Sequence, residues 1–395
     1  MTKYNLIVNT GSSSKKYAVY AGERELANLH LEAVDKNKKP AFLFTFRWDD
    51  RKLVGEVSQN DYSHALEYLF KLLKEWWLLK SKDEIERVGI RVVAPGLIFQ
   101  QNSIIDTKYI KALKEAEQRA PLHLGTILFE LTNLRKFFGK KPIVGISDSA
   151  FHHTTIDKAR YYAIPLADTK KYEIYRYGYH GISLESIVHK LKQEKALPKR
   201  LIVCHMGSGV SLTAIKDGKS IDTTMGFTPL EGMVMATRVG DIDPGAVIYL
   251  SKKKQLNHEQ LMAYFNKQSG LFGLSGGLSD DTRALLKYEV EGNDQAKLAL
   301  EHRIYKIQKQ IGAFAVALGG LDMIVFSATI GERGFEHRER ICNELECLGV
   351  KLDKKVNGAT IGAENVISAK DSRVVVRVVK TDESGSMARA LVKVK

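Results

Sequence analysis

The chain has 395 residues, of which 44% are hydrophobic and 27% are charged, and its formal net charge is +14. This length predicts about two domains, and no apolar run reaches the roughly 18 residues of a membrane helix, so we expect no membrane partner. The first residues contain no charged segment followed by an apolar one, so we expect no secretion signal.

The cysteines and lysines bear on the predicted cellular location and on the class of binding partner. Cys204, Cys342 and Cys347 form no C-x-x-C pair, which predicts free thiols and a cytoplasmic location. The positive charge is compatible with nucleic-acid binding or with small anionic substrates. Because the lysines are scattered and not interleaved with aromatic residues, we favour small anions and expect no nucleic-acid partner.

Apolar runs and helical periodicity alternate along the chain, which predicts an α/β fold. In chain order, the predicted elements are strands at 5–9 and 17–20, a helix at 63–79, a strand at 87–93, helices at 107–117 and 127–138, a strand at 142–147, a helix at 183–194, strands at 201–205 and 212–215, helices at 258–266 and 295–318, a strand at 322–326, a helix at 337–348 and a strand at 374–379. Within 295–318, apolar residues recur at helical spacing.

Two segments resemble each other. Residues 6–14 are LIVNTGSSS and residues 201–211 are LIVCHMGSGVS, and each combines an apolar strand with a Gly-Ser turn and a second strand. The repeat predicts two similar domains, each opening with a hairpin. Amides and hydroxyls at such tips suit phosphate oxygens, and Lys16 would reach a terminal phosphate. The alternative is an ordinary hairpin with a solvated tip. The chain contains neither a P-loop nor a G-x-G-x-x-G fingerprint.

Polar residues suited to chemistry gather in three further segments. His180 in YGYHGIS precedes a predicted helix, and its alternative role is structural. Arg238 follows MGFTPLEG and suits an anionic oxygen group, whereas nearby Asp241 either orients its loop or binds a metal. Asp148 follows a predicted buried strand, which is a typical ligand-facing position, although a helix N-cap is the alternative.

Together these segments resemble the acetate kinase (acetokinase) family of the sugar kinase, heat-shock protein and actin superfamily, nearly from end to end. The segments that carry the resemblance are NTGSSSKK, GIRVVAPG, RAPLHL, YGYHGIS, MGFTPLEG and TRVGDIDP. The resemblance implies an α/β protein with two duplicated actin/ribonuclease-H-like domains and an interdomain cleft. Residues 1–150, joined by about 384–395, would form the N-terminal domain, and 151–383 the nucleotide-binding domain.

The family implies a reversible, magnesium-dependent transfer of phosphate from ATP to acetate, giving acetyl phosphate and ADP, by a cytoplasmic homodimer. The metal would be Mg²⁺, with Mn²⁺ as an alternative, held by Asn9 and Glu383. Pyrophosphate as donor and propionate as acceptor are the alternative substrates. A nucleotide-sensing protein without catalysis is a third hypothesis, which the retained polar residues disfavour.

Matching positions imply the remaining roles. The catalytic residues would be Arg91, His123, Asp148, His180 and Arg238. The substrate-binding residues would be Arg91, Val93, Leu122, Tyr179 and Pro229. The nucleotide-binding residues would be Ser12, Ser14, Lys16, His205, Met206, Gly207, Ser208, Gly209, Asp281, Thr282, Arg283, Thr329, Ile330, Gly331, Glu332 and Arg333.

The sequence departs from the family pattern mainly on the nucleotide side. Ser208 and Arg333 replace asparagines, Thr329 replaces a glycine, and Thr282 replaces a larger apolar residue. A Cβ at Thr329 would narrow the phosphate site, so the donor stays open between ATP and pyrophosphate. Tyr179 replaces phenylalanine, which would add a hydroxyl to the acyl pocket. Because one methylene is worth only about 1–3 kcal/mol, propionate should be a poorer but real substrate.

Overall fold

The computed structural model describes residues 3–11, 14–36, 39–117, 119 and 121–394. The chain divides into two compact units. Unit 1 comprises Met1–Ala150, Gly181–Ser186 and Asp382–Lys395, and unit 2 comprises Phe151–His180 and Ile187–Thr381. In the described part of the chain, no helix has the length and apolar character needed to cross a bilayer.

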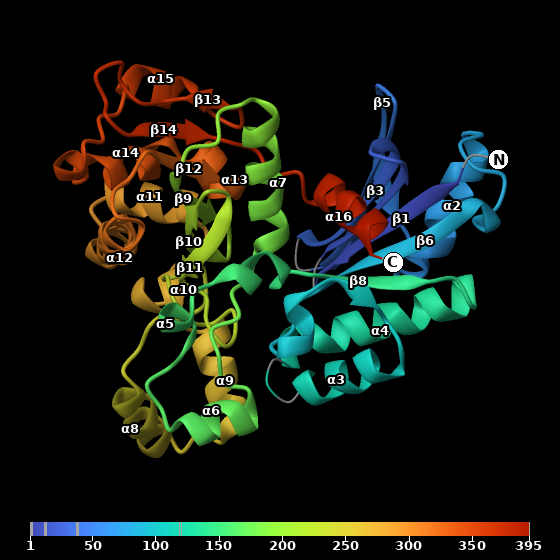
Figure 1. Ribbon diagram of the computed structural model, residues 1–395, viewed down its shortest axis with the longest axis horizontal. Coiled ribbons are helices and arrows are strands. Elements are labelled where there is room, and N and C mark those ends of the chain that lie inside the picture. Colours follow the sequence, from blue (N-terminus) through green and yellow to red (C-terminus); the bar gives the residue numbers. More distant parts are fainter. Residues whose placement is uncertain (1–2, 12–13, 37–38, 118, 120, 395) are drawn as a thin grey trace. The chain divides into compact units, whose positions relative to one another are not determined.

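Unit 1 contains a sheet with the strand order β5-β4-β3-β2-β1-β6-β8-β7 (Figure 1). Neighbours from β5 to β1 are antiparallel, whereas β1, β6 and β8 pair in parallel. The strands are β1 (Tyr4–Thr10), β2 (Ser14–Ala21), β3 (Arg24–Lys36), β4 (Lys39–Trp48), β5 (Arg51–Val57), β6 (Ile85–Val92), β7 (Ser103–Ile104) and β8 (Ile143–Ser147).

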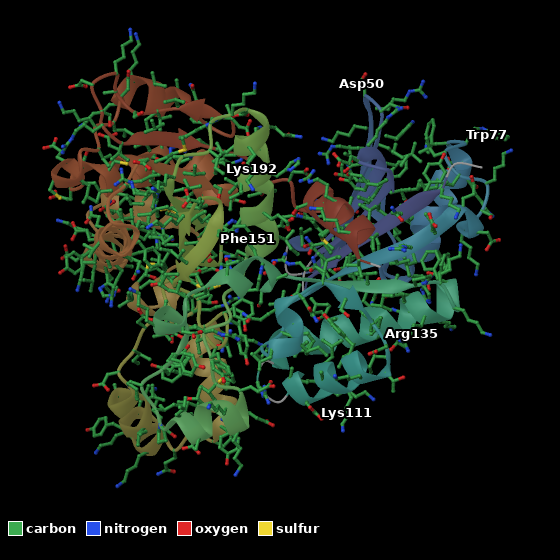
Figure 2. All side chains as sticks on the ribbon, viewed as in Figure 1. Asp50, Trp77, Lys111, Arg135, Phe151 and Lys192 are labelled. Carbon is green, nitrogen blue, oxygen red and sulfur yellow. The ribbon has the colours of Figure 1, made fainter. Side chains whose placement is uncertain are left out.

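Helices cover both faces of this sheet. One face packs against α2 (Ala65–Glu75), α3 (Thr107–Glu117) and α4 (Pro121–Phe138), and the other against α16 (Glu383–Lys393). Leu6 and Val8 of β1 point to the first face and Ile7 to the second, so the strand is buried on both sides. This double burial explains why the segment is continuously apolar. Arg135 of α4, labelled in Figure 2, donates to the Ile105 carbonyl at 2.9 Å.

The sheet of unit 2 has the order β11-β10-β9-β12-β14-β13. From β11 to β14, both the order and the strand directions match β3-β2-β1-β6-β8 of unit 1. The predicted duplication is therefore confirmed at the level of topology, and each copy opens with an antiparallel hairpin. The strands are β9 (Arg200–Met206), β10 (Val210–Lys216), β11 (Lys219–Thr223), β12 (Met323–Ser327), β13 (Asn365–Val366) and β14 (Val375–Val378).

The longest described helix, α12 (Asp294–Leu318), packs in unit 2 against α10, α11 and α14. Its buried residues include Ile304, Ile307, Ile311, Phe314 and Leu318, as the periodicity predicted. The other helices are α1 (Gln59–Ser63) in unit 1; α7 (Gly181–Gln193), which begins in unit 1 and continues in unit 2; and, in unit 2, α5 (Asp157–Arg160), α6 (Leu166–Tyr172), α8 (Pro244–Lys254), α9 (His258–Lys267), α10 (Gly270–Leu274), α11 (Thr282–Val290), α13 (Ala328–Arg333), α14 (Phe335–Asn343) and α15 (Lys354–Ala359).

The predicted strands and helices are all present, with shifted ends. The sequence analysis missed β3, β4 and β5, as well as other elements such as α8, α11 and β11. In β3, Ala27, Leu29 and Leu31 are buried while the residues between them are more polar. This is the alternation of a strand with one exposed face, and it is a weaker signal than a continuous apolar run.

Candidate active site

The first cluster of polar side chains lies in unit 1, where three parallel strands end. Asn9 lies near the end of β1, Arg91 near the end of β6, and Asp148 directly after β8. The carboxyl ends of parallel neighbours lie at the same edge of the sheet, so these residues converge. Glu383, the first residue of α16, completes what we call the carboxylate cluster.

Arg91 is the centre of the carboxylate cluster. Its Nη2 donates to Asp148 Oδ2 at 2.9 Å, and its Nη1 lies 3.5 Å from Glu383 Oε2 and 3.4 Å from Asn9 Oδ1. Burial of the guanidinium opposes its charge, but the two carboxylates outweigh burial and raise the pKa of Arg91. Asp148 is 1% exposed, so its bond to Arg91 is a buried one.

Both carboxylate oxygens of Glu383 are held by hydrogen bonds. Asn9 Nδ2 donates to Oε2 at 2.9 Å, and Ser183 Oγ in the first turn of α7 donates to Oε1 at 2.5 Å. The sequence analysis did not identify Ser183, although it lies within the quoted segment YGYHGIS. The Asn9 carbonyl and the Glu383 carboxylate are hard oxygen donors, which suit Mg²⁺.

Two protein oxygen donors suit a metal ion whose remaining ligands are supplied by a substrate and water. The described residues contain no group of three or more His, Cys, Asp or Glu side chains able to hold a metal alone. Mg²⁺ is commonly bound by one or two carboxylates together with waters and substrate phosphates. Asn9 and Glu383 form a donor pair of this kind.

A second cluster, the cation cluster, lies in unit 2 at the tip of the β9–β10 hairpin. His180 precedes α7 with φ = 62°, and its Nδ1 lies 2.9 Å from Ser211 Oγ of β10. Its ring lies 4.3 Å from the His205 ring of β9. A Cβ built on Gly209 would lie 3.4 Å from His180 Nε2 and 3.8 Å from Arg238 Nη1. A side chain at this tip would thus fill the space beside both residues.

Arg238 differs from Arg91 in its partners. Its Nη1 donates to the Pro229 carbonyl at 3.2 Å and contacts Met235 Sδ at 3.8 Å. No carboxylate of the described residues pairs with it, and burial lowers its pKa. The charge of Arg238 is therefore available to an anion.

The unusual backbone of His180 depends on His152, another residue that the sequence analysis did not assign. His152 Nε2 lies 2.9 Å from the Tyr179 carbonyl, and Nδ1 lies 2.9 Å from Ser220 Oγ. Gly178 packs against the His152 ring with φ = 75°, and a Cβ there would approach Cγ to 2.5 Å. His152 thus supports the turn that presents His180.

The loop at 225–232, which carries Pro229, is held from several sides. Glu231 pairs with Arg176 at 2.5 Å and accepts from the Tyr162 hydroxyl. That hydroxyl accepts from Phe227 N at 2.8 Å, and the Tyr179 hydroxyl donates to the Phe227 carbonyl at 2.7 Å. The hydroxyl that distinguishes Tyr179 from the family's phenylalanine thus bonds to the backbone of this loop.

Asp241 holds the end of the same loop. Its Oδ1 accepts from Gly232 N at 2.9 Å. Of the two roles considered for Asp241, the contacts favour loop orientation over metal binding.

The predicted nucleotide-binding residues of unit 2 lie on three elements. Residues 205–209 form the end and tip of the β9–β10 hairpin, where Gly207 N donates to Gly209 O at 2.9 Å. Asp281 caps α11, which starts at Thr282, and pairs with Arg283 at 2.6 Å. Thr329 to Arg333 lie in α13. Burial raises the pKa of Glu332 in that helix.

The remaining predicted residues belong to unit 1. Exposed Lys16 pairs with Asn9 in the β1–β2 register, and the Ser14 carbonyl accepts from Gly11 N at 2.8 Å. Val93 is half-buried after β6. Ser12 lies outside the described residues. His123 and Leu122 belong to α4, and their side chains also lie outside the description.

Comparison with known proteins gives consistent results over the whole length. The model of the acetokinase family matches residues 4–389. The acetate kinase of Thermotoga maritima is 40% identical over 392 residues, which cover 97% of this chain and 96% of the relative. The crystal structure of Porphyromonas gingivalis acetate kinase has a TM-score of 0.85 at 33% identity, covering 99% of both chains. A propionate kinase from Francisella tularensis has a TM-score of 0.88 at 31% identity, covering 100% of both.

Proposed function

Because the chain belongs to the acetokinase family, we propose that it transfers a phosphoryl group reversibly from ATP to acetate, giving ADP and acetyl phosphate. The observation that carries the proposal is the pairing of Arg91 with Asp148 and Glu383 at the ends of parallel strands. The cation cluster of His180 and Arg238 supports it, because two anions must react and positive charge must offset their repulsion.

The acceptor needs orientation rather than activation. A carboxylic acid with an ordinary pKa near 4 is ionised at neutral pH, so acetate attacks without losing a proton. We infer that Asp148 acts by holding the guanidinium of Arg91, which orients the acetate carboxylate, and not as a general base. Val93, Leu122 and Pro229 would surround the methyl group, and Tyr179 would position the loop of Pro229.

The phosphoryl group gains charge on its oxygens as it moves, and Arg238 and His180 would stabilise that charge. Each preorganised donor of this kind is worth on the order of 2.7–4 kcal/mol in the barrier. Lys16 would contact the ATP phosphate, and His123 would support His180. When bound, Mg²⁺ neutralises phosphate charge. Asn9 and Glu383 would hold it, with Ser183 fixing the carboxylate; Mn²⁺ is an alternative.

We infer ATP as the donor, bound by Ser12, Ser14 and Lys16 of unit 1 and by 205–209, 281–283 and 329–333 of unit 2. A cytoplasmic homodimer is part of the same proposal, by resemblance to the family. Propionate is the second candidate acceptor, since a propionate kinase is among the similar solved structures.

A donor and acceptor comparison tests the proposal. The purified chain with Mg²⁺, acetate and hydroxylamine should form acetyl hydroxamate with ATP and not with pyrophosphate. Propionate should give product at a lower kcat/KM than acetate. Product with pyrophosphate but not with ATP would show that pyrophosphate is the donor. A higher kcat/KM for propionate than for acetate would show that propionate is the acceptor. No product with either donor would overturn the proposal.

A further inference from the structure

A buried arginine in unit 2 lacks the partners that its charge requires. Arg303 of α12 is 1% exposed. A guanidinium carries five N–H donors. Among the described residues, its side-chain acceptor is the Thr282 hydroxyl, which lies 3.4 Å from both Nη1 and Nη2, and Nε has no partner. One hydroxyl oxygen cannot satisfy five donors.

A histidine beside Arg303 is equally buried and unsatisfied. His337 of α14 is 1% exposed, and neither ring nitrogen has a hydrogen-bond partner within the described ranges. Burial, followed by the charges of Arg303 and Arg340, lowers the pKa of His337 well below its usual value. The neutral ring therefore offers one N–H donor and one acceptor.

Two nearby carboxylates already have other partners. Glu289 is paired with Arg340 at 2.7 Å, and Asp281 is paired with Arg283. Burial lowers the pKa of Arg303 to about 10, with no carboxylate raising it, so the group stays charged at neutral pH. A buried charge without a counterion is strongly destabilising.

The residue that contacts Arg303, Thr282, is the first residue of α11. The start of this helix is capped by the Asp281 carboxylate, which accepts from Arg283 N at 2.8 Å. The Thr282 hydroxyl, and not the amides of the helix, is therefore the group available beside Arg303.

We propose that Arg303, Thr282 and His337 together bind a small monovalent inorganic anion of the size of chloride. The anion would accept hydrogen bonds from the guanidinium, from the Thr282 hydroxyl and from the His337 ring. The near-complete burial of Arg303 and His337 excludes a nucleotide or a phosphate ester. The site is distinct from the carboxylate and cation clusters. Thr282 is also one of the proposed ATP-binding residues, but the tests below measure anion binding without nucleotide and do not depend on the proposed function.

Bromide provides a direct test on the wild-type protein. Crystals of the full chain grown in sodium bromide should show an anomalous scattering peak beside Arg303 Nε and the His337 ring. Bromide resembles chloride and scatters anomalously, whereas water does not. Density without an anomalous signal at this place would identify a water molecule and overturn the proposal.

Thermal unfolding tests the energetic consequence. At constant ionic strength, replacing gluconate by chloride should raise the Tm of the wild-type chain by about 2 °C or more. Arg303→Met should lose this increment and should be at least as stable as the wild type in gluconate, because it removes an unpaired buried charge. Arg200, on β9, forms a half-buried pair with Asp322. Arg200→Met breaks that pair, is the matched control and should keep the increment.

An equal chloride response in wild type and Arg303→Met would contradict the proposal. If Arg303→Met does not fold, His337→Phe provides a second variant, and the bromide experiment on the wild type decides independently.

Discussion

The carboxylate cluster and the cation cluster hold their arginines in opposite ways. Arg91 is bonded to Asp148 and lies near Glu383, and these carboxylates raise its pKa. Arg238 is bonded to a backbone carbonyl, and burial lowers its pKa. A paired guanidinium is fixed in place and largely neutralised, which suits orientation of a substrate. One without a carboxylate keeps its field for charge that develops during a reaction. The comparison predicts that substitutions in the two clusters will affect kcat and kcat/KM differently.

The largest effect is expected from Arg238. Arg238→Ala should lower kcat by about 10²–10³-fold with a smaller change in KM for acetate, because it removes stabilisation that is strongest in the transition state. Steady-state kinetics with an unchanged circular dichroism spectrum would check this result. Arg373→Ala, which removes an exposed arginine of the same unit that has no assigned role, is the comparison variant. A near-normal kcat for Arg238→Ala would remove the cation cluster from the mechanism.

The second prediction concerns Asp148. Asp148→Asn keeps the shape of the side chain but weakens the hold on Arg91, so kcat/KM for acetate should fall by about 10–10²-fold through misorientation. The pH–rate profile should keep its wild-type shape, because no proton is removed from acetate. Loss of a titrating limb in the variant would instead identify Asp148 as a general base and would contradict a purely orienting role.

The sequence itself predicted part of the carboxylate cluster and less of what surrounds the cation cluster. Asn9 and Asp148 each follow an apolar run, and the carboxyl ends of neighbouring parallel strands lie at the same edge of a sheet. Arg91 lies inside the predicted strand 87–93, and its role came from the family resemblance. Glu383 came from the family resemblance, and its bond to Asn9 spans 374 residues. No local pattern predicts that pairing.

Contacts between turns and distant loops are harder to predict from the sequence than the ends of buried strands. His152 bonds to Ser220 and supports Gly178, and Tyr162 reaches Glu231, but none of these segments shows a periodicity that predicts its partner. The donor of the Phe227 bond, Tyr179, was visible in the sequence as a departure from phenylalanine. Its hydroxyl could not be oriented without the backbone of the 225–232 loop.

The third prediction tests that hydroxyl. Tyr179→Phe keeps the ring and removes the hydrogen bond to the Phe227 carbonyl, which should loosen the loop around Pro229. We expect a loss of about 1 kcal/mol in stability and a roughly threefold decrease in the preference for acetate over propionate. Relative kcat/KM values for the two acids measure this preference. Tyr161→Phe, at a partly exposed tyrosine, is the control, and an increased acetate preference in Tyr179→Phe would show that the hydroxyl acts inside the pocket.

The smallest effect on catalysis is expected from Asp222 in β11, which lies near Arg176 and Glu231. Burial raises the pKa of Asp222 to about 6, compared with about 3.9 in an unfolded chain. The folded state therefore binds this proton more tightly. The stabilising contribution is complete below about pH 3.9 and is lost as the pH rises through about 6.

Asp222→Asn removes the cost of the buried charge while its side-chain oxygen can still accept from Thr223 N. The variant should exceed the wild type in unfolding free energy by about 2–3 kcal/mol at pH 8 and by little at pH 4. Urea unfolding at both pH values measures the difference, with exposed Asp217→Asn as the control. A variant that is less stable than the wild type at pH 8 would contradict this prediction. It would mean that the Asp222 charge stabilises the folded state through Arg176, as the carboxylates stabilise Arg91.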